Sequence, residues 1–423
     1  MFVNLKNKFA NSEENKRLIS NIFSLTILQG ANYILPLLTM PYLVRVLGPD
    51  YFGLLAFSSA TIAYFALVTD YGFNLSATRQ ISIFRGDQKK VNDIFSSVML
   101  IKIGLMFASF FVMIALVLIF DKFKDHWDLY LISFGMVVGQ VIFPVWLFQG
   151  MEKMKYITYL NIGAKVIFTV CIFIFVKKQS DFLLVPFFTS LGFILSGVLS
   201  LILAKKEFKV KLTLQKFENI KFQLIEGWHI FFSDIAISLY TISNTFILGL
   251  FSNNTVVGYF SAADRIIQAV KGLYMPVSKS IYPLIGKKIH DNRRLGLLFV
   301  KKITLFVSSG MLFFSLIVFL FSEPIINIFL GEQYHQSIIL LKVMSFLPFI
   351  ISLSNMYGIQ TMLNLGYKKQ FSRILIIAAA IGLCLALILV PIYSDFGTAI
   401  NLLLVEIIVT STMYVFLKLK KVL

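Results

Sequence analysis

The charged residues that interrupt the long apolar stretches of this sequence are those best placed to do chemistry. The stretch Val256–Ile285 contains both Arg265 and Lys279. On an α-helix these two side chains lie within roughly 40° of each other and about 21 Å apart along the axis. A membrane helix with two cations on one stripe is expected to turn that stripe toward water or an anion, although Lys279 can instead extend to the inner surface. Asp264 and Lys271 share a second stripe, and we expect them to be structural or to pair between two halves of the chain.

Four more ionisable residues lie deep in other apolar stretches. Lys165 is about 15 Å into its stretch, and Asp234 and Glu406 are at similar depth in theirs. Asp70 is expected about two turns from Arg79 on the same helix, and can pair with a cation or act in gating. A charge at the centre of a membrane helix costs about 2.5–3.5 kcal/mol, so such residues usually face a cavity or a partner. We expect Lys165 to line a cavity and the three carboxylates to be gating or ion-coupling residues; structural counter-ions are the alternative.

The first apolar stretch carries polar groups and two prolines. Gln29, Asn32 and Tyr33 precede Pro36 and Pro41. Such a segment can bend and expose its backbone to a cavity. We therefore predict that the three polar residues contact a cavity; a proline kink packed between helices is the alternative.

Residues of the kind that enzymes and metal sites use form no recognisable motif. The sequence has four histidines and two cysteines, and contains no HExxH, CxxC or Walker pattern. We predict that the chain is not an enzyme and holds no metal or cofactor. The one small ligand that the acidic residues suggest is a coupling H⁺ or Na⁺.

The composition requires that most of the chain be solvated by a lipid bilayer. Hydrophobic residues make up 58% of the 423 residues and charged residues only 14%, against about a quarter in soluble domains. The net charge of +18 does not indicate nucleic-acid binding, because the Lys and Arg residues are scattered in small clusters. Stretches of about 20 apolar residues predict membrane-spanning helices. Twelve occur, of which the seventh and eighth are the most polar: Leu18–Leu47, Tyr51–Ala77, Ile94–Phe120, Leu129–Phe148, Ile157–Val176, Phe182–Ala204, Phe222–Phe251, Val256–Ile285, Ile303–Phe321, Ile338–Leu363, Ile374–Ile392 and Phe396–Leu417.

The distribution of Lys and Arg predicts the orientation of these helices. With the N-terminus in the cytoplasm, 28 of the 39 basic residues fall in the seven inner segments and five at outer ends. This is the asymmetry of the positive-inside rule. We predict a multi-pass protein with both termini in the cytoplasm.

The twelve helices divide into two predicted halves. The longest inner connection, residues 205–221, lies between the sixth and seventh helices, and YFGLLAFSSA at 51–60 resembles VVGYFSAADR at 256–265. Two repeats of the same orientation imply a pseudo-twofold axis along the membrane normal, with a site between them at the midplane. The predicted division is a cytoplasmic segment 1–17, an N-lobe 18–204, a linker 205–221, a C-lobe 222–417 and a cytoplasmic tail 418–423.

Several stretches resemble the polysaccharide-transporter family, the Wzx-type flippases of O-antigen. They are QGANY at 29–33, PLLTMPYLVRVLGPDYFG at 36–53, DYGFNLSATR at 70–79 and GYFSAADRI at 258–266. That family belongs to the multidrug/oligosaccharidyl-lipid/polysaccharide exporter superfamily. The resemblance implies an all-α membrane protein of two six-helix lobes around a V-shaped central cavity, working by alternating access.

The implied substrate is an undecaprenyl-pyrophosphate-linked oligosaccharide, flipped from the cytoplasmic to the periplasmic leaflet of a bacterial inner membrane. The resemblance also implies a polysaccharide polymerase and a chain-length regulator as partners. Arg45, Asp70, Arg79 and Arg265 occupy motif positions. We predict that these arginines hold the pyrophosphate. Lys165 and Lys279 are added to this set because of their depth alone. An anchor at the outer surface is the alternative for Arg45.

Three other functions are less consistent with the sequence. A drug or cation antiporter of the same superfamily would favour an acidic cavity without the midplane Lys and Arg. A peptidoglycan-precursor flippase would usually carry two extra helices. A membrane polysaccharide polymerase or glycosyltransferase would usually carry a large outer loop, whereas the longest predicted here has about fifteen residues.

Overall fold

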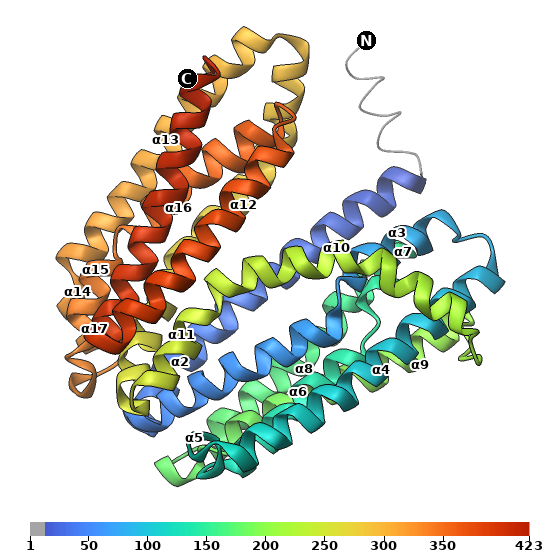
Figure 1. Ribbon diagram of the computed structural model, residues 1–423, viewed down its shortest axis with the longest axis horizontal. Helices are drawn as coiled ribbons and strands as arrows, with labels where there is room; N and C mark the ends of the chain where they lie inside the picture. Colours follow the sequence, from blue (N-terminus) through green and yellow to red (C-terminus); the bar gives the residue numbers. More distant parts are fainter. Residues whose placement is uncertain (1–12, 423) are drawn as a thin grey trace. The chain divides into compact units, whose positions relative to one another are not determined.

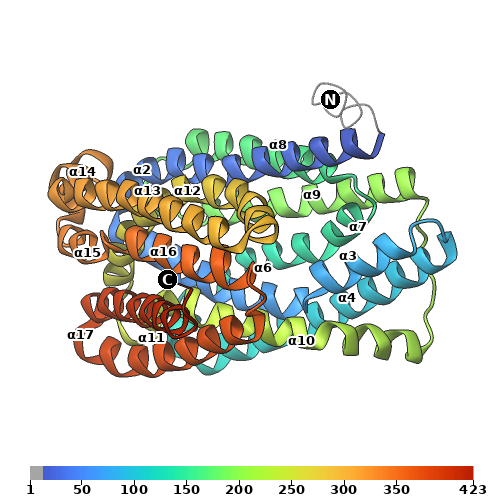
Figure 2. The same ribbon diagram turned by 90° about the horizontal axis from the view of Figure 1, so that it is seen from above.

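The computed structural model describes residues 13–422, which form helices joined by short turns, with no β-strand among them (Figures 1 and 2). Most of the cytoplasmic segment predicted at residues 1–17 lies outside the described part of the chain. Within the described part, eight helices are long and apolar enough to cross a membrane. The prediction of an all-α membrane protein is therefore confirmed.

Ten of the twelve predicted segments overlap these eight helices, because two long helices each contain two predicted segments. The helix α2 (Glu13–Asp70) includes Gly48 at φ 72°, and α17 (Lys368–Leu419) includes Ser394 at φ 55°. At each of these non-helical residues two helices meet. The two segments that the eight helices leave out are the most polar of the twelve, so the count of twelve stays a prediction.

The chain forms two compact units. The first unit comprises the residues up to Thr39 and Thr61–Ile235, and the second comprises Met40–Ala60 and Ala236–Leu423. Besides its part of α2, the first unit contains α3 (Phe73–Ile83), α4 (Gln88–Ile119), α5 (Asp121–Lys124), α6 (Trp127–Ile142), α7 (Val145–Gly150), α8 (Met154–Phe175), a 3₁₀ turn (Gln179–Asp181), α9 (Leu184–Phe208) and most of α10 (Phe217–Thr241).

The second predicted helix is broken in the first unit. Tyr71 and Gly72 have φ of 48° and 73°, so α2 ends at Asp70 and a new helix, α3, follows. A Cβ at Gly72 would lie 2.7 Å from side-chain atoms of Ile230, which leaves room only for glycine. The prediction that Asp70 and Arg79 lie on one continuous helix is therefore wrong.

The fourth predicted helix is also divided, at Pro144, which separates α6 from α7. Proline lacks the N–H that would continue the helix. Beyond this break Trp146 is completely buried in an apolar core that includes Phe73, Ile81 and Phe95. The break therefore contributes a large aromatic side chain to the centre of the first unit.

The residues between α9 and α10 lie against α4 of the same unit. Ser96 Oγ accepts a hydrogen bond from the backbone N–H of Thr213 at 2.9 Å, and Asn92 Oδ1 accepts one from that of Lys211 at 3.2 Å. Gln215 Nε2 donates to Asp93 Oδ1 at 3.3 Å. The connection is thus held to the surface of the first unit through its backbone.

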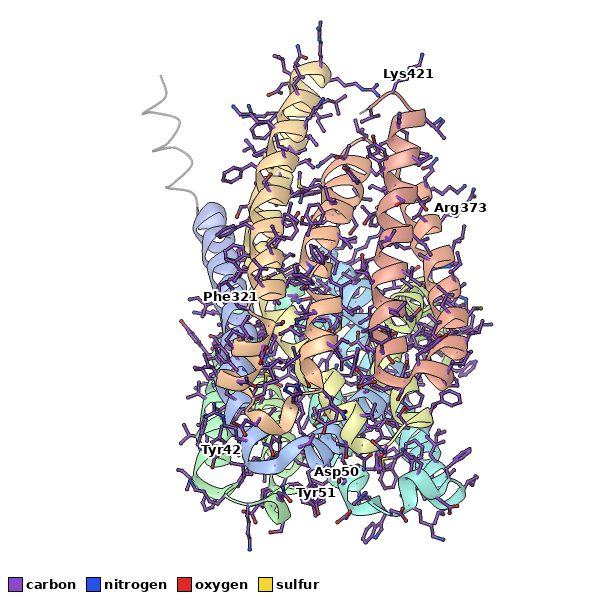
Figure 3. The ribbon with its side chains drawn as sticks, turned by 90° about the vertical axis from the view of Figure 1, so that its left-hand side faces the viewer. Tyr42, Asp50, Tyr51, Phe321, Arg373 and Lys421 are labelled. Carbon is purple, nitrogen blue, oxygen red and sulfur yellow. The ribbon has the colours of Figure 1, made fainter. Side chains whose placement is uncertain are left out.

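The second unit contains Met40–Ala60 and the C-terminal helices. These are α11 (Ser243–Phe251), α12 (Asn254–Asp291), α13 (Arg293–Leu320), α14 (Ser322–Phe329), a 3₁₀ turn (Glu332–Tyr334), α15 (Ser337–Met344), α16 (Leu347–Asn355), a π-helix (Met356–Leu363) and α17. Figure 3 shows Arg373 and Lys421 toward the end of this unit opposite to Asp50 and Tyr51.

The two similar sequence stretches, 51–60 and 256–265, meet in the second unit. A Cβ at Gly53 would lie 1.8 Å from the carbonyl oxygen of Asn254, and one at Gly258 would lie 2.0 Å from that of Pro49. Backbones that approach this closely require glycine on both sides. Thr255 Oγ1 adds a hydrogen bond to Asp50 Oδ1 at 3.1 Å.

Candidate substrate and ion sites

A buried ion pair lies in the first unit. Lys102 of α4 is 2% exposed, and its Nζ lies 3.6 Å from Oδ1 of Asp70, which is 16% exposed. Asn74 Nδ2 donates to the same oxygen at 2.8 Å. Asp234 of α10 is half-buried and close enough to Asp70 for the two charges to interact. The cation beside Asp70 is therefore Lys102, which the sequence alone could not identify; the gating roles of Asp70 and Asp234 stay predictions.

Two of the predicted cavity residues contact each other in the first unit. Lys165 Nζ of α8 donates to Asn32 Oδ1 of α2 at 2.5 Å. Lys165 also lines a cavity of about 100 Å³ between α8 and α9. The polar side chains around this cavity are those of Asn161, Thr169, Thr189 and Ser196. Gln29 is half-buried on α2, and the side chain of Tyr33 lies outside the described part.

The two remaining predicted arginines are exposed and belong to different units. Arg79 lies on α3 in the first unit. Arg45 lies in the second unit, where its guanidinium donates to the carbonyl oxygen of Ile328 in α14. Gln333 Nε2 donates to the carbonyl oxygen of Val44 at 2.9 Å. The role of Arg45, as a cavity cation or as an outer-surface anchor, stays a prediction.

The charged residues of α12 follow the two stripes expected from their spacing. Arg265 and Lys279 are both exposed, whereas Asp264 and Lys271 are half-buried. Asp264 and Lys271 line the same cavity within the second unit, so their shared stripe is confirmed. That stripe packs inside one unit.

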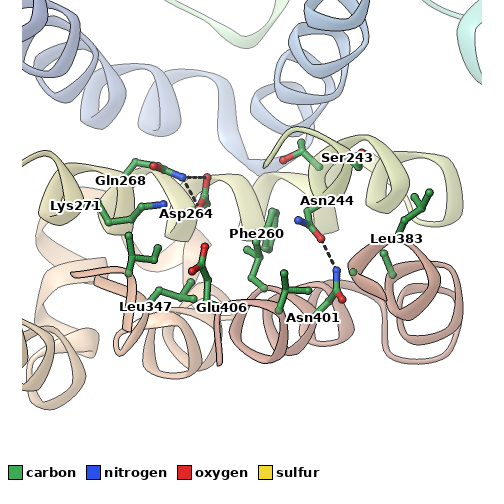
Figure 4. Close-up of a pocket in the computed structure, with 16 residues that line it drawn as sticks. Ser243, Asn244, Phe260, Asp264, Gln268, Lys271, Leu347, Leu383, Asn401 and Glu406 are labelled. Carbon is green, nitrogen blue, oxygen red and sulfur yellow. Dashed lines mark hydrogen bonds between the residues drawn. The ribbon is translucent and has the colours of Figure 1, made fainter. Parts of the chain in front are cut away.

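This cavity, which we call the C-unit pocket, has a volume of about 180 Å³ and is enclosed by α11, α12, α16 and α17. Figure 4 shows Glu406 of α17 pointing toward Asp264 and Lys271 of α12. Lys271 interacts electrostatically with both carboxylates. Gln268 Nε2 donates to Asp264 Oδ1 at 3.2 Å. The sequence placed Glu406 at mid-bilayer depth but did not connect it with α12, because the two are far apart in the chain.

A second polar cluster in this unit was missed from the sequence. Tyr274 Oη and Ser278 Oγ each donate to Asn355 Oδ1 at 2.8 Å. Gln360 Nε2 donates to the carbonyl oxygen of Ser278 at 2.9 Å. Gln360 lies in the π-helix and is completely buried. Its signal in the sequence is weak, since uncharged polar residues are common in membrane helices.

Among residues 13–422, no group of three or more His, Cys, Asp or Glu side chains is arranged to hold a metal ion. Both cysteines are free thiols.

Comparison with known proteins assigns relatives over nearly the whole chain. The profile of a family described as "Polysaccharide biosynthesis protein" matches residues 18–289. A "Putative O-antigen transporter" of Escherichia coli (strain K12) is 38% identical over 403 residues, which are 95% of this chain and 97% of the relative. A protein of the same description from Shigella dysenteriae is 30% identical over 396 residues, covering 92% of this chain and 97% of the relative.

Two solved structures are similar to the fold. The lipid II flippase MurJ, in an inward closed conformation, matches with a TM-score of 0.66 at 15% sequence identity. The match covers 95% of this chain and 87% of the MurJ chain. An inward-facing multidrug resistance transporter of the MATE family, in the MOP superfamily, matches with a TM-score of 0.67 at 13% sequence identity. The match covers 91% of this chain and 94% of the transporter chain. At these identities the likeness concerns the fold alone.

Proposed function

Because this chain belongs to the family of polysaccharide biosynthesis proteins, we propose that it is a flippase for a lipid-linked oligosaccharide. The substrate is an undecaprenyl-pyrophosphate-linked repeat unit used for O-antigen or another surface polysaccharide. It moves from the cytoplasmic to the periplasmic leaflet of a bacterial inner membrane. The protein acts as a transporter and catalyses no covalent step.

One observation carries this proposal. The relative named as an O-antigen transporter matches 95% of this chain at 38% identity, so the similarity extends over both units. A similarity confined to one unit would leave the function of the other open. Resemblance to a multidrug resistance transporter of the MATE family is restricted to the fold, and therefore gives the antiporter alternative little support.

The cations of both units suit an anionic lipid headgroup. Lys165 in the first unit, and exposed Arg265 and Lys279 on α12, are side chains that form strong charge-assisted bonds to phosphate oxygens. Arg79 is a further candidate. Gln29, Asn32 and Tyr33 are the proposed contacts to the sugars, because amides and aromatic rings suit neutral hydroxylated ligands.

The proposed topology places both termini in the cytoplasm, following the positive-inside distribution. In it, an N-lobe (18–204) and a C-lobe (222–417) of six helices each are joined by the linker 205–221, and alternate access to a central cavity. A coupling H⁺ or Na⁺ supplies the energy. The polymerase that uses the flipped repeat unit and its chain-length regulator are the proposed partners.

Transfer of a fluorescent pyrophosphate-linked oligosaccharide between leaflets of proteoliposomes tests this function. Wild type is expected to transfer the lipid. Arg265→Ala and Lys165→Ala are each expected to slow transfer by about tenfold or more, because each loses one charge-assisted bond worth about 1.5–3 kcal/mol. Lys342→Ala is the control, since it removes one exposed cation that is not among the proposed substrate contacts. Normal transfer by both variants would show that these cations are structural. No transfer by wild type would contradict the proposed function.

A further inference from the structure

Three large apolar side chains are exposed in and just after the connection between α9 and α10. Leu212 is 61% exposed, Leu214 100% and Phe217 76%. Phe208 and Val210, which precede them, are by contrast buried in the apolar core of the first unit. The chain therefore packs its first apolar residues inward and turns the next three outward. Exposed apolar side chains that polar residues surround mark an interaction surface, and we call these three residues the linker surface.

Hydrogen bonds to α4 fix the backbone that carries the two leucines. The N–H of Thr213, which lies between Leu212 and Leu214, donates to Ser96 Oγ at 2.9 Å. The same hydroxyl donates to the carbonyl oxygen of Lys211 at 3.1 Å. Because the backbone faces α4 at this point, the leucine side chains are held outward.

These hydrogen bonds also place the linker surface at the edge of the membrane. Both α4 and α9 are long and apolar enough to span a bilayer, and the connection starts directly after α9 ends, at Phe208. It lies at the same end of the first unit as the turn between α3 and α4 (Figures 1 and 2). The apolar stretch of α4 begins at Ile94, so Ser96 is close to the level where the hydrocarbon begins. The leucines bound beside Ser96 therefore lie near the boundary between headgroups and acyl chains.

Cations border the linker surface. Residues 205–221 contain six Lys and two Glu, and six minus two leaves a net charge of +4. Lys209, Lys211 and Lys216 are exposed between the apolar residues. Exposed apolar side chains next to lysines are typical of segments that lie in the interface of an anionic membrane, where the lysines reach the phosphate groups. A protein partner would need an acidic and apolar surface at this depth, so lipid is the occupant that the position favours.

We propose that the linker surface binds anionic phospholipids of the surrounding bilayer. Its three apolar side chains enter the upper part of the acyl chains, and Lys209, Lys211 and Lys216 bind the phosphate groups. The ligand is bulk bilayer lipid and not the transported molecule, so the proposal does not depend on the flippase function. By this binding the connection between the two predicted lobes is held at the membrane surface.

Lipid contact is measured on the full-length protein in nanodiscs without lipid-linked substrate. A fluorescent probe is attached to Leu214→Cys, after Cys171→Ser and Cys384→Ser have removed the two free thiols. Quenching by a nitroxide on the upper acyl chain is compared for phosphatidylglycerol and phosphatidylcholine at equal lipid fraction, and iodide reports contact with water. A probe on Asp291→Cys, an exposed residue at the end of α12, is the reference for a site in water.

The probe at residue 214 is expected to be quenched by lipid nitroxide and protected from iodide, and the probe at residue 291 to show the reverse. At low salt, phosphatidylglycerol should quench the probe at residue 214 about twofold or more better than phosphatidylcholine, because lysines enrich anionic lipid around them. High salt should reduce this difference, since it screens the attraction.

Two sets of substitutions test the role of the lysines. Each set changes three exposed lysines to glutamine: Lys209, Lys211 and Lys216 at the linker surface, and Lys368, Lys369 and Lys420 of the second unit as the matched control. The linker set is expected to abolish the preference for phosphatidylglycerol, because each lysine near an anionic surface gives about a fivefold gain in binding. Quenching by phosphatidylcholine should remain, since the apolar side chains are unchanged. The control set should keep the preference.

Quenching of the probe at residue 214 by iodide but not by lipid nitroxide would overturn the proposal, because the linker surface would then face water, as a docking site for a soluble protein would. A preference for phosphatidylglycerol that survives the linker set, or that the control set also removes, would overturn the role of these lysines. A misfolded variant would differ from both, because it would also lose quenching by phosphatidylcholine.

Discussion

Breaking the Asp70–Lys102 pair is expected to destabilise the first unit strongly. Lys102→Met keeps much of the side-chain volume but leaves Asp70 without its cation. At 3.6 Å and an effective dielectric constant of about 20, the lost attraction is about 4–5 kcal/mol. Removing one member of a buried pair typically costs about 3–5 kcal/mol. Both figures describe the loss of the stabilisation that the buried Asp70 carboxylate receives from Lys102.

A double-mutant cycle separates this effect from loss of packing. Asp70→Asn with Lys102→Met removes both charges and should regain most of the stability, since no unpaired charge remains. In a thermal melt of the detergent-solubilised protein, Lys102→Met is expected to lower Tm by roughly 3–6 °C. Additive effects of the two substitutions would show that Asp70 and Lys102 are not coupled.

Two further predictions concern packing within each unit. Gly53→Ala places a Cβ 1.8 Å from the Asn254 carbonyl oxygen and should destabilise the protein by about 1–3 kcal/mol. Gly104→Ala is the control, because no neighbouring atom lies within 4 Å of its added Cβ. Equal melting temperatures of the two variants would contradict the close approach at Gly53. Gln80 and Gln223 exchange two buried hydrogen bonds of 2.9 and 2.8 Å. Gln223→Leu should therefore cost about 1–3 kcal/mol, most of it recovered by adding Gln80→Leu, and failure of that recovery would argue against the paired arrangement.

The sequence predicted the membrane segments well because the bilayer imposes a minimum length on apolar stretches. It did not predict the break after Asp70, which depends on the close approach of Ile230 to Gly72. Such a contact joins helices far apart in the chain. Local apolar periodicity contains no information about it.

The sequence predicted only those parts of the candidate sites that lie on a single helix. The spacing of Asp264 and Lys271 showed that they share a helix face, because seven residues make nearly two complete turns. That Glu406 faces them, and that Lys102 faces Asp70, depends on how separate helices pack. Depth in the membrane identified most of these residues individually but not their partners.

The most direct test of the flippase function compares two substrates in the same proteoliposomes. One is an undecaprenyl-pyrophosphate-linked oligosaccharide and the other is a lipophilic cationic dye of the kind that drug antiporters export. A flippase is expected to transfer the anionic lipid between leaflets and to cause no movement of the dye. Movement of the dye without transfer of the lipid would contradict the flippase function and favour a drug transporter instead.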